Sequence, residues 1–74
     1  MQPVFVLIND NGEFLCKRGN GKHFASRTEL VHAMTYQHKK ALETMVADKW
    51  YWNYRGIDIK SFHIVPATLM LKVN

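Results

Sequence analysis

The chain has 74 residues, of which 47% are hydrophobic and 22% are charged, and ten Lys and Arg against six Asp and Glu give a net charge of +4. That composition is typical of one folded domain, and no apolar run approaches the roughly 20 residues that cross a bilayer. Cys16 is the only cysteine, which excludes an intramolecular disulfide scaffold and favours a reducing compartment. We therefore expect a single cytoplasmic domain over residues 1–74, without a secretory leader or a membrane partner.

The first element predicted is a β-hairpin. Residues 4–8 form an unbroken apolar run rich in β-branched and aromatic side chains, which indicates a buried strand. Asn11 and Gly12 tolerate the positive φ angles of a type I′ turn, and Asp10 can bond its own backbone there. Residues 13–17 then return as a second strand. This hairpin is the strongest local signal in the sequence.

A helix is expected in the middle of the chain. Two glycines in residues 18–22 mark a second turn, and residues 23–25 are then expected to be a short extended segment. Ser26, followed by a glutamate three residues later, fits a capping box at the start of a helix. Helical spacing continues over residues 27–53, with a break near residues 35–38 as the alternative, because a single helix of that length is unusual in so small a domain.

The last third of the chain is expected to return to the sheet. The aromatic cluster at residues 50–54 fits either the end of the helix or an extended exit from it, and Gly56 closes the cluster as a C-cap or turn residue. Residues 57–64 and 68–73 alternate as strands, with Pro66 between them indicating a bulge, a bend or an edge position. The sequence therefore predicts an α+β domain. It would have an N-terminal β-hairpin, one main helix packed on a small antiparallel sheet, and C-terminal strands beside the first.

No catalytic or metal-binding constellation is recognisable. Cys16 lies in strand alternation without a nucleophile motif, so it is expected to be a small, half-buried hydrophobic residue. His32 and His38 are six residues apart, not at the i, i+4 spacing that places two metal ligands on one helix face. Gly19 and Gly21 are too close together for a Walker phosphate loop. We therefore predict no enzyme activity, no metal and no cofactor.

Nucleic-acid binding is the alternative that the charge distribution favours. Basic residues occur in two clusters, one on the second turn and one in the middle of the chain: Lys17, Arg18, Lys22, Lys39 and Lys40. Aromatic residues near Lys49 and Arg55 add the combination of stacking and phosphate neutralisation that single strands need. No named nucleic-acid motif is present.

Protein binding is the preferred hypothesis. Methionines and aromatic residues exceed what a small core needs, and aromatic residues, Met and Arg are enriched at interfaces. The helix exit supplies the expected contact surface: Tyr51, Trp52, Tyr54 and Arg55. Trp50, at helical spacing from Met45 and Val46, is expected in the core. An edge beside the terminal strands could also accept an added strand. The alternative is that these residues fill the monomer core or a homodimer interface.

The sequence also resembles a group of small bacteriophage accessory proteins. Residues 5–15 resemble their opening strand, polar turn ending in Gly, and second strand. Residues 33–36 and 40–42 match an Ala-x-x-aromatic element and the helix that follows it, and residues 64–66, Ile-Val-Pro, match a closing strand. The resemblance implies a short strand at residues 33–36 and a helix that starts near His38. It also implies a protein that binds and inhibits or redirects a host protein in the host cytoplasm.

Overall fold

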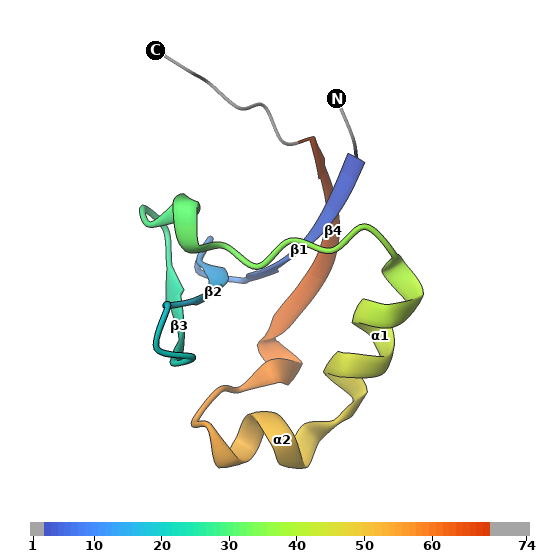
Figure 1. Ribbon diagram of the computed structural model, residues 1–74. Helices are drawn as coiled ribbons and strands as arrows, with labels where there is room; N and C mark the ends of the chain where they lie inside the picture. The colour runs from blue at the N-terminus through green and yellow to red at the C-terminus, as the bar shows by residue number, and fades with distance from the viewer. Residues whose placement is uncertain (1–2, 69–74) are drawn as a thin grey trace.

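The computed structural model describes residues 3–68, which form an α+β domain as predicted (Figure 1). Its elements, in chain order, are β1 (Pro3–Asn9), β2 (Phe14–Lys17), β3 (His23–Ser26), η1 (Leu30–His32), α1 (Lys39–Ala47), α2 (Lys49–Tyr54), η2 (Ile59–Ser61) and β4 (Phe62–Thr68). The four strands make one antiparallel sheet in the order β3-β2-β1-β4. Both terminal strands therefore lie side by side in one sheet, as the sequence predicts.

The first hairpin is confirmed, but its turn differs from the predicted type I′. Gly12, with φ 76°, is the residue in the left-handed region, and Asn11 has an ordinary negative φ. The Gly12 N–H donates to the Asn9 carbonyl (3.0 Å) and the Asn9 N–H to the Glu13 carbonyl (2.9 Å). The Asn9 side chain, not that of Asp10, accepts the backbone N–H groups of Asn11 and Glu13. This pattern is a type I turn followed by a bulge at glycine.

The second turn repeats this geometry and builds another hairpin. Gly21 has φ 86°, and its N–H donates to the Arg18 carbonyl at 2.9 Å. The Asn20 side chain accepts the Lys22 N–H at 3.0 Å. The extended segment expected at residues 23–25 is thus the full strand β3, with Phe24 paired to Cys16 of β2.

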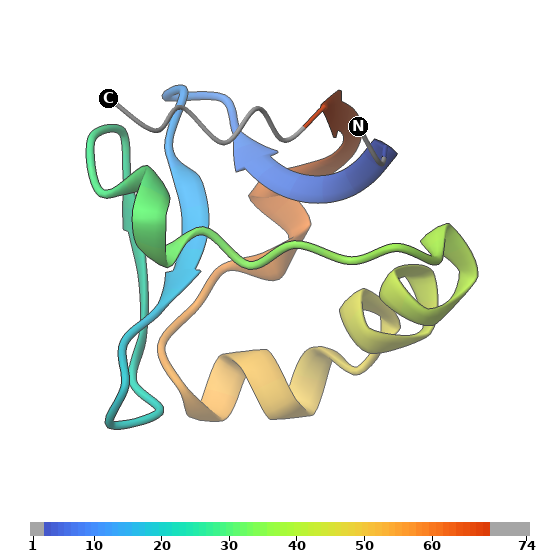
Figure 2. The same cartoon turned by 45° about the horizontal axis from the view of Figure 1, so that its top comes forward.

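The predicted helix over residues 27–53 is wrong in its first third. The Ser26 hydroxyl does accept the N–H groups of Thr28 and Glu29 (3.2 and 3.1 Å), but only a single 3₁₀ turn follows. Residues 33–36, here called the wedge segment, then run extended toward α1 (Figure 2). The helix begins at Lys39, with His38 at the N-cap, as the phage resemblance implies.

The wedge segment fills a gap between two strands. Tyr36 exchanges both backbone hydrogen bonds with Phe5 of β1, at 2.7 and 2.9 Å. Ala33 bridges to Cys16, and the Met34 N–H donates to the Leu15 carbonyl of β2. These contacts satisfy β1 and β2 backbone groups that the strands do not pair with each other. These hydrogen bonds explain why residues 33–36 are extended and do not continue the helix that the Ser26 cap predicts.

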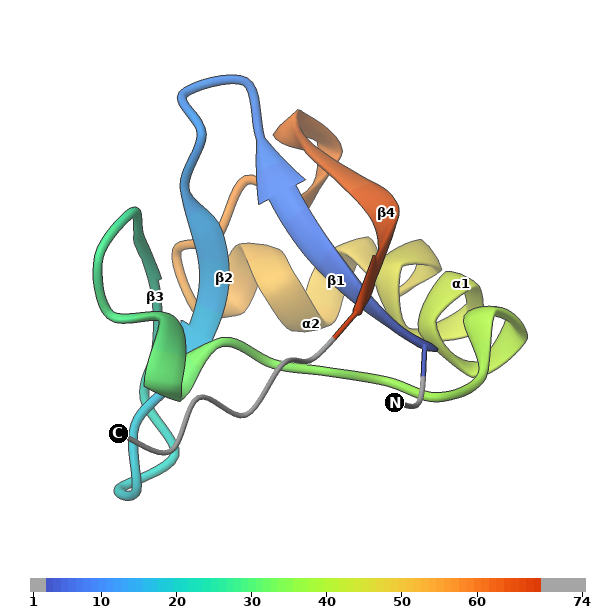
Figure 3. The same cartoon turned by 90° about the horizontal axis from the view of Figure 1, so that it is seen from above.

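The core lies between one face of the sheet and the two helices (Figure 3). Its buried members are Leu7, Leu15, Leu42, Trp52 and Ile59. Trp52 is 0% exposed, and its indole N–H donates to the Met45 carbonyl of α1 at 3.0 Å. Asp48 separates the two helices and caps α2 by accepting the Tyr51 N–H at 3.1 Å. Trp52 thus joins α2 to α1 across the break.

The C-terminal prediction is confirmed in part. β4 pairs with β1 along its whole length, from Asn9 opposite Phe62 to Pro3 opposite Thr68. Pro66 lies within this continuous edge strand, so the edge position, among the alternatives predicted for it, is correct. The strand expected at residues 57–64 is interrupted by the 3₁₀ turn η2. Residues 69–73 of the strand predicted at 68–73 lie outside the described residues.

Candidate functional site

The two tryptophans of α2 have environments opposite to those predicted. Trp50, expected in the core, is 74% exposed, and Trp52, expected at the partner surface, is completely buried. Residues two apart lie about 200° apart around a helix, so only one of the pair can face the core. Trp52 is therefore unavailable for contact with a partner, and Trp50 takes its place on the surface.

Trp50 forms a flat aromatic platform with Tyr54 on the outer side of α2. Their ring centroids are 5.6 Å apart, the planes differ by only 7°, and Tyr54 is 76% exposed. One helical turn separates the two residues, which is the spacing that brings side chains into contact. The predicted pair Tyr51 and Arg55 also comes together, with the guanidinium carbon 3.5 Å from the Tyr51 ring centroid. We call Trp50, Tyr51, Tyr54 and Arg55 the α2 surface.

A cavity of about 550 Å³ opens beside Trp50, between α2 and the turn leading to η2. Trp50 and Ile57 give it apolar walls, and Lys49, Asp58 and Lys60 line it with charge. A second cavity of about 500 Å³ lies between α1 and β4, and it shares Lys49 and Lys60 with the first. The two cavities are therefore adjacent, with Lys49, Ile59 and Lys60 between them, and together we call them the groove.

The groove carries lysines without carboxylate partners. Within residues 3–68 the ion pairs are Arg18 with Glu29 (3.2 Å) and His63 with Asp10 (3.0 Å), both exposed. Neither pair includes Lys49 or Lys60. These ammonium groups are thus free to meet an acidic ligand.

The structure separates the basic residues of the nucleic-acid hypothesis. Lys17, Arg18 and Lys22 lie around the β2–β3 turn, whereas Lys39 and Lys40 begin α1, at the opposite end of the molecule (Figures 1 and 2). Arg18 is also held by Glu29 and lies 4.3 Å over the Phe24 ring. The five residues therefore do not form one continuous basic surface.

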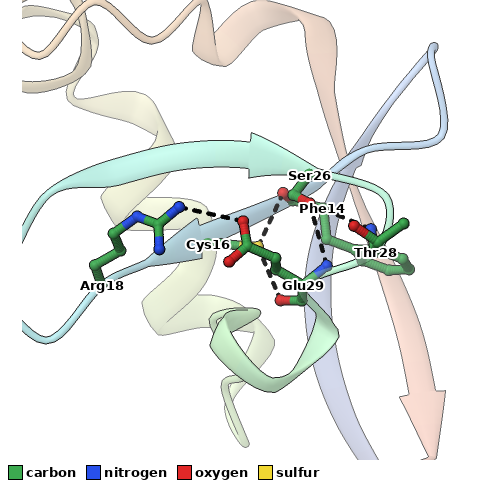
Figure 4. A network of polar contacts seen from close by, with 6 residues as sticks. All are labelled: Phe14, Cys16, Arg18, Ser26, Thr28 and Glu29. Atoms are coloured by element: carbon green, nitrogen blue, oxygen red, sulfur yellow. Dashed lines mark hydrogen bonds and ion pairs between the residues drawn. The ribbon is translucent and has the colours of Figure 1, made fainter.

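Cys16 sits inside a polar network rather than in an open site (Figure 4). It is completely buried, not half-buried as predicted, and its Sγ lies 3.3 Å from the Phe14 carbonyl and 3.7 Å from the Glu29 carbonyl. Burial raises the pKa of the thiol, and the nearby Glu29 carboxylate raises it further. The thiol is therefore protonated at neutral pH and is a poor nucleophile.

His23 joins β3 to α2 through its ring. The ring lies edge-on to Trp52, with centroids 4.9 Å apart, and its buried Nδ1 has no hydrogen-bond partner within residues 3–68. Burial lowers the pKa of His23, and the positive charges of Lys17 and Arg55 lower it further. The imidazole is therefore neutral at pH 7. Sequence reasoning did not single out this contact, because it joins residues 29 positions apart.

No protein family, curated protein or solved structure shows a significant similarity to this chain. In the described range no group of three or more His, Cys, Asp or Glu residues converges as metal ligands would. Across residues 3–68 both helices are too short to traverse a lipid bilayer.

Proposed function

We propose that this protein is a small, non-enzymatic binding protein that contacts a partner protein through the α2 surface. The observation that carries the proposal is the exposed, stacked pair of Trp50 and Tyr54 beside the groove. Trp, Tyr and Arg are enriched among the residues that dominate the energetics of protein interfaces, and Trp and Tyr bury a large area at a small cost in conformational entropy. A tryptophan exposed by 74% contributes little to the fold.

Two further observations support a binding role over catalysis. The sole thiol is buried and protonated. The pair formed by Arg55 and Tyr51 is pre-ordered, because the Arg55 guanidinium also donates to the Tyr51 carbonyl at 3.1 Å. A pre-ordered arginine loses less side-chain freedom on binding, which favours recognition. The ordered Arg55 is therefore the observation of the two that concerns the α2 surface itself.

In its specific form, we propose a phage-type accessory protein that inhibits or redirects a host protein in the host cytoplasm. The sequence resemblance in residues 5–15, 33–36 and 64–66 supports this form. The partner would then be a protein of the infected cell.

The test is affinity capture from nuclease-treated bacterial lysate. The bait is the full chain, compared with a Trp50→Ala, Tyr54→Ala double variant. The matched control is Leu30→Ala, Val31→Ala, which removes two other exposed apolar side chains, 54% and 88% exposed, from η1. We expect a stoichiometric protein that the wild type and the control retain and the α2 variant loses.

Two results would contradict the proposal. One is capture of no protein by the wild type. The other is equal capture by the wild type and the α2 variant. Sedimentation of the bait alone shows whether the same aromatic residues instead join two copies of the chain, the homodimer alternative.

Nucleic-acid binding is the second candidate, favoured by one observation. Trp50 and Tyr54 present ring faces beside Lys49, as base-stacking platforms do. In this case the platform would act together with Lys39 and Lys40 of α1. Its affinity for a single strand would fall steeply with salt, because counterions are released from phosphates. An apolar protein interface would respond far less.

A further inference from the structure

Among residues 3–68, β4 is an edge strand of the sheet, with β1 as its neighbour on one side only. In β1, Phe5 directs its N–H and carbonyl to Tyr36, and the Asn9 N–H points to Glu13, all away from β4. Because backbone groups alternate along a strand, the intervening residues of β1 bond to β4, Val6 with Val65 among them. Ile64 of β4 therefore directs its N–H and carbonyl outward, along the open edge.

The outward-facing stretch of β4 is short. Pro66 also faces the open edge by the same alternation, and proline has no N–H to donate. At the other end, the Phe62 N–H already donates to the Ile59 carbonyl. The N–H of Ile64 is thus the central donor left on this edge, flanked by the carbonyls of Phe62 and Pro66. Proline on an edge is a known protection against uncontrolled strand pairing.

Residues of the edge strand β4 line part of the groove. The cavity of about 500 Å³ between α1 and β4 is lined by apolar Val46, Phe62 and Ile64. Lys39, Lys49 and Lys60 surround it, against Glu43 as the acidic lining residue. An edge strand beside a helix is the geometry that accepts an extended peptide: the backbone supplies affinity, and the pockets for alternate side chains supply specificity.

We propose that an extended acidic segment of the partner protein adds to β4 as a fifth strand, centred on Ile64. Its backbone pairs with the open edge, and its carboxylates meet Lys39, Lys49 and Lys60. The segment then continues toward Trp50 past Lys49 and Lys60, which line both cavities. This inference rests on the proposed function, because it names the chemistry of the partner that the α2 surface contacts.

The edge suits a foreign acidic strand better than a second copy of this chain. A two-fold pairing about Ile64 would set Phe62 opposite Pro66 of the other copy, where one N–H is absent and the other is already bonded. It would also bring two sets of groove lysines together, and like charges across an interface oppose association. A partner strand that carries carboxylates avoids the repulsion, and its own N–H groups can donate to the carbonyls of Phe62 and Pro66.

The experiment measures fluorescence anisotropy of two labelled peptides with the full chain. One peptide has four Glu-Val repeats and the other four Lys-Val repeats. We expect the acidic peptide to bind at least about tenfold more tightly, with an affinity that falls as salt rises. Equal binding of the two peptides, or no binding of the acidic one, would overturn the inference.

Backbone pairing is tested by variants of the open edge. Ile64→Pro removes the outward N–H, and Ile64→Ala is its matched control, which shortens the side chain but keeps that N–H. We expect binding to weaken roughly tenfold more in the proline variant. Pro66→Ala adds an N–H to the edge and should strengthen binding about threefold, which keeps the test decisive if Ile64→Pro does not fold. No gain from Pro66→Ala, or equal binding by folded Ile64→Pro and Ile64→Ala, would contradict strand addition.

The outcomes separate this inference from the proposed function. Host-protein capture that depends on Trp50, combined with no peptide binding, would overturn strand addition alone. Peptide binding that depends on the Ile64 N–H, without capture of any host protein, would support the acidic-strand site and reject the host-protein function. An oligothymidine that binds more tightly than the acidic peptide, with equal affinity for the Ile64 variants, would overturn strand addition in favour of nucleic acid.

Discussion

The hairpin region, residues 3–26, and the helical region, residues 30–61, are shaped by different kinds of contact. In the hairpin region, two turns with the same hydrogen-bond pattern place glycine where φ is positive, and an asparagine side chain braces each turn. In the helical region, α2 has only six residues and depends on Trp52, which reaches the Met45 carbonyl of α1. The first region is specified by neighbours in sequence, the second by contacts across the domain.

The sharpest test of this difference is truncation of the two tryptophans. Trp52→Ala should lower the free energy of unfolding by roughly 3–5 kcal/mol, because it empties the centre of the core. Trp50→Ala, from an exposed position on the same helix, should change it by less than about 1 kcal/mol. Urea unfolding followed by circular dichroism measures both. Trp52→Phe serves if the alanine variant is unfolded, and similar losses at the two positions would refute the assignment of faces.

The hairpin region should respond to changes in backbone freedom instead. Gly21→Ala should cost about 1–2 kcal/mol, because alanine is strained at φ 86° although nothing lies within 4 Å of its Cβ. Gly19→Ala, in the same turn and equally unobstructed, has no positive φ to maintain and should be neutral or slightly stabilising. Thermal unfolding measures the stability of both variants. An equal loss of stability at the two positions would show that the positive φ of Gly21 is not the cause.

The helical region should become more stable if its sequence is given a local capping signal of the kind that the hairpin region already has. His38 is the N-cap of α1, but its side chain makes no capping hydrogen bond. His38→Asp should raise the free energy of unfolding by about 1 kcal/mol. Its carboxylate can accept a backbone N–H of the first turn of α1, and its negative charge interacts favourably with the positive end of the helix dipole. His38→Ala separates this gain from mere loss of the imidazole. Chemical denaturation of the three proteins measures the effect, and equal stability of the Asp and Ala variants would contradict it.

The smallest expected effect on stability is a pH dependence that comes from His23, whose ring joins the hairpin region to α2. The folded protein holds the pKa of His23 below its ordinary value of 6.5, mainly through burial. As pH falls below about 6.5, the unfolded chain takes up the proton first, so the free energy of unfolding should fall. The effect is modest because the ring is half-buried. Stability measured from pH 7.5 to 5 should fall less steeply in His23→Gln, and parallel profiles would exclude this role for His23.

The sequence predicts the hairpin region, residues 3–26, better than the helical region, residues 30–61. Residues 4–8 and the two glycine turns could be placed because each signal is complete within a few residues. The capping signal at Ser26 is also real, since its hydroxyl accepts two backbone N–H groups. The helix it predicts does not form, because the wedge segment instead satisfies groups of β1 and β2. That competition is invisible in local sequence.

The exchange of the two tryptophans has a more specific cause. Counting helical spacing from Met45 through Trp50 assumes an unbroken helix, but Asp48 ends α1 and caps α2. The break resets the helical phase, so Trp52 faces the core and Trp50 faces outward. An aspartate three residues before Tyr51 is a recognisable N-cap signal, and it was the clue available in the sequence. Of the predicted surface, Tyr54 and Arg55 are exposed and Tyr51 is half-buried against the core, whereas the groove could not be predicted.

The buried thiol of Cys16 gives the molecule a built-in reporter. Its sulfur lies beside β3 and under η1, and Ala33 of the wedge segment bridges to its backbone. A thiol reagent can reach it only while this cover is lifted, so the labelling rate in native buffer measures the free energy of that local opening. Comparison with the labelling rate of an unstructured cysteine peptide would therefore give the stability of the wedge segment against local opening, without any substitution in the chain.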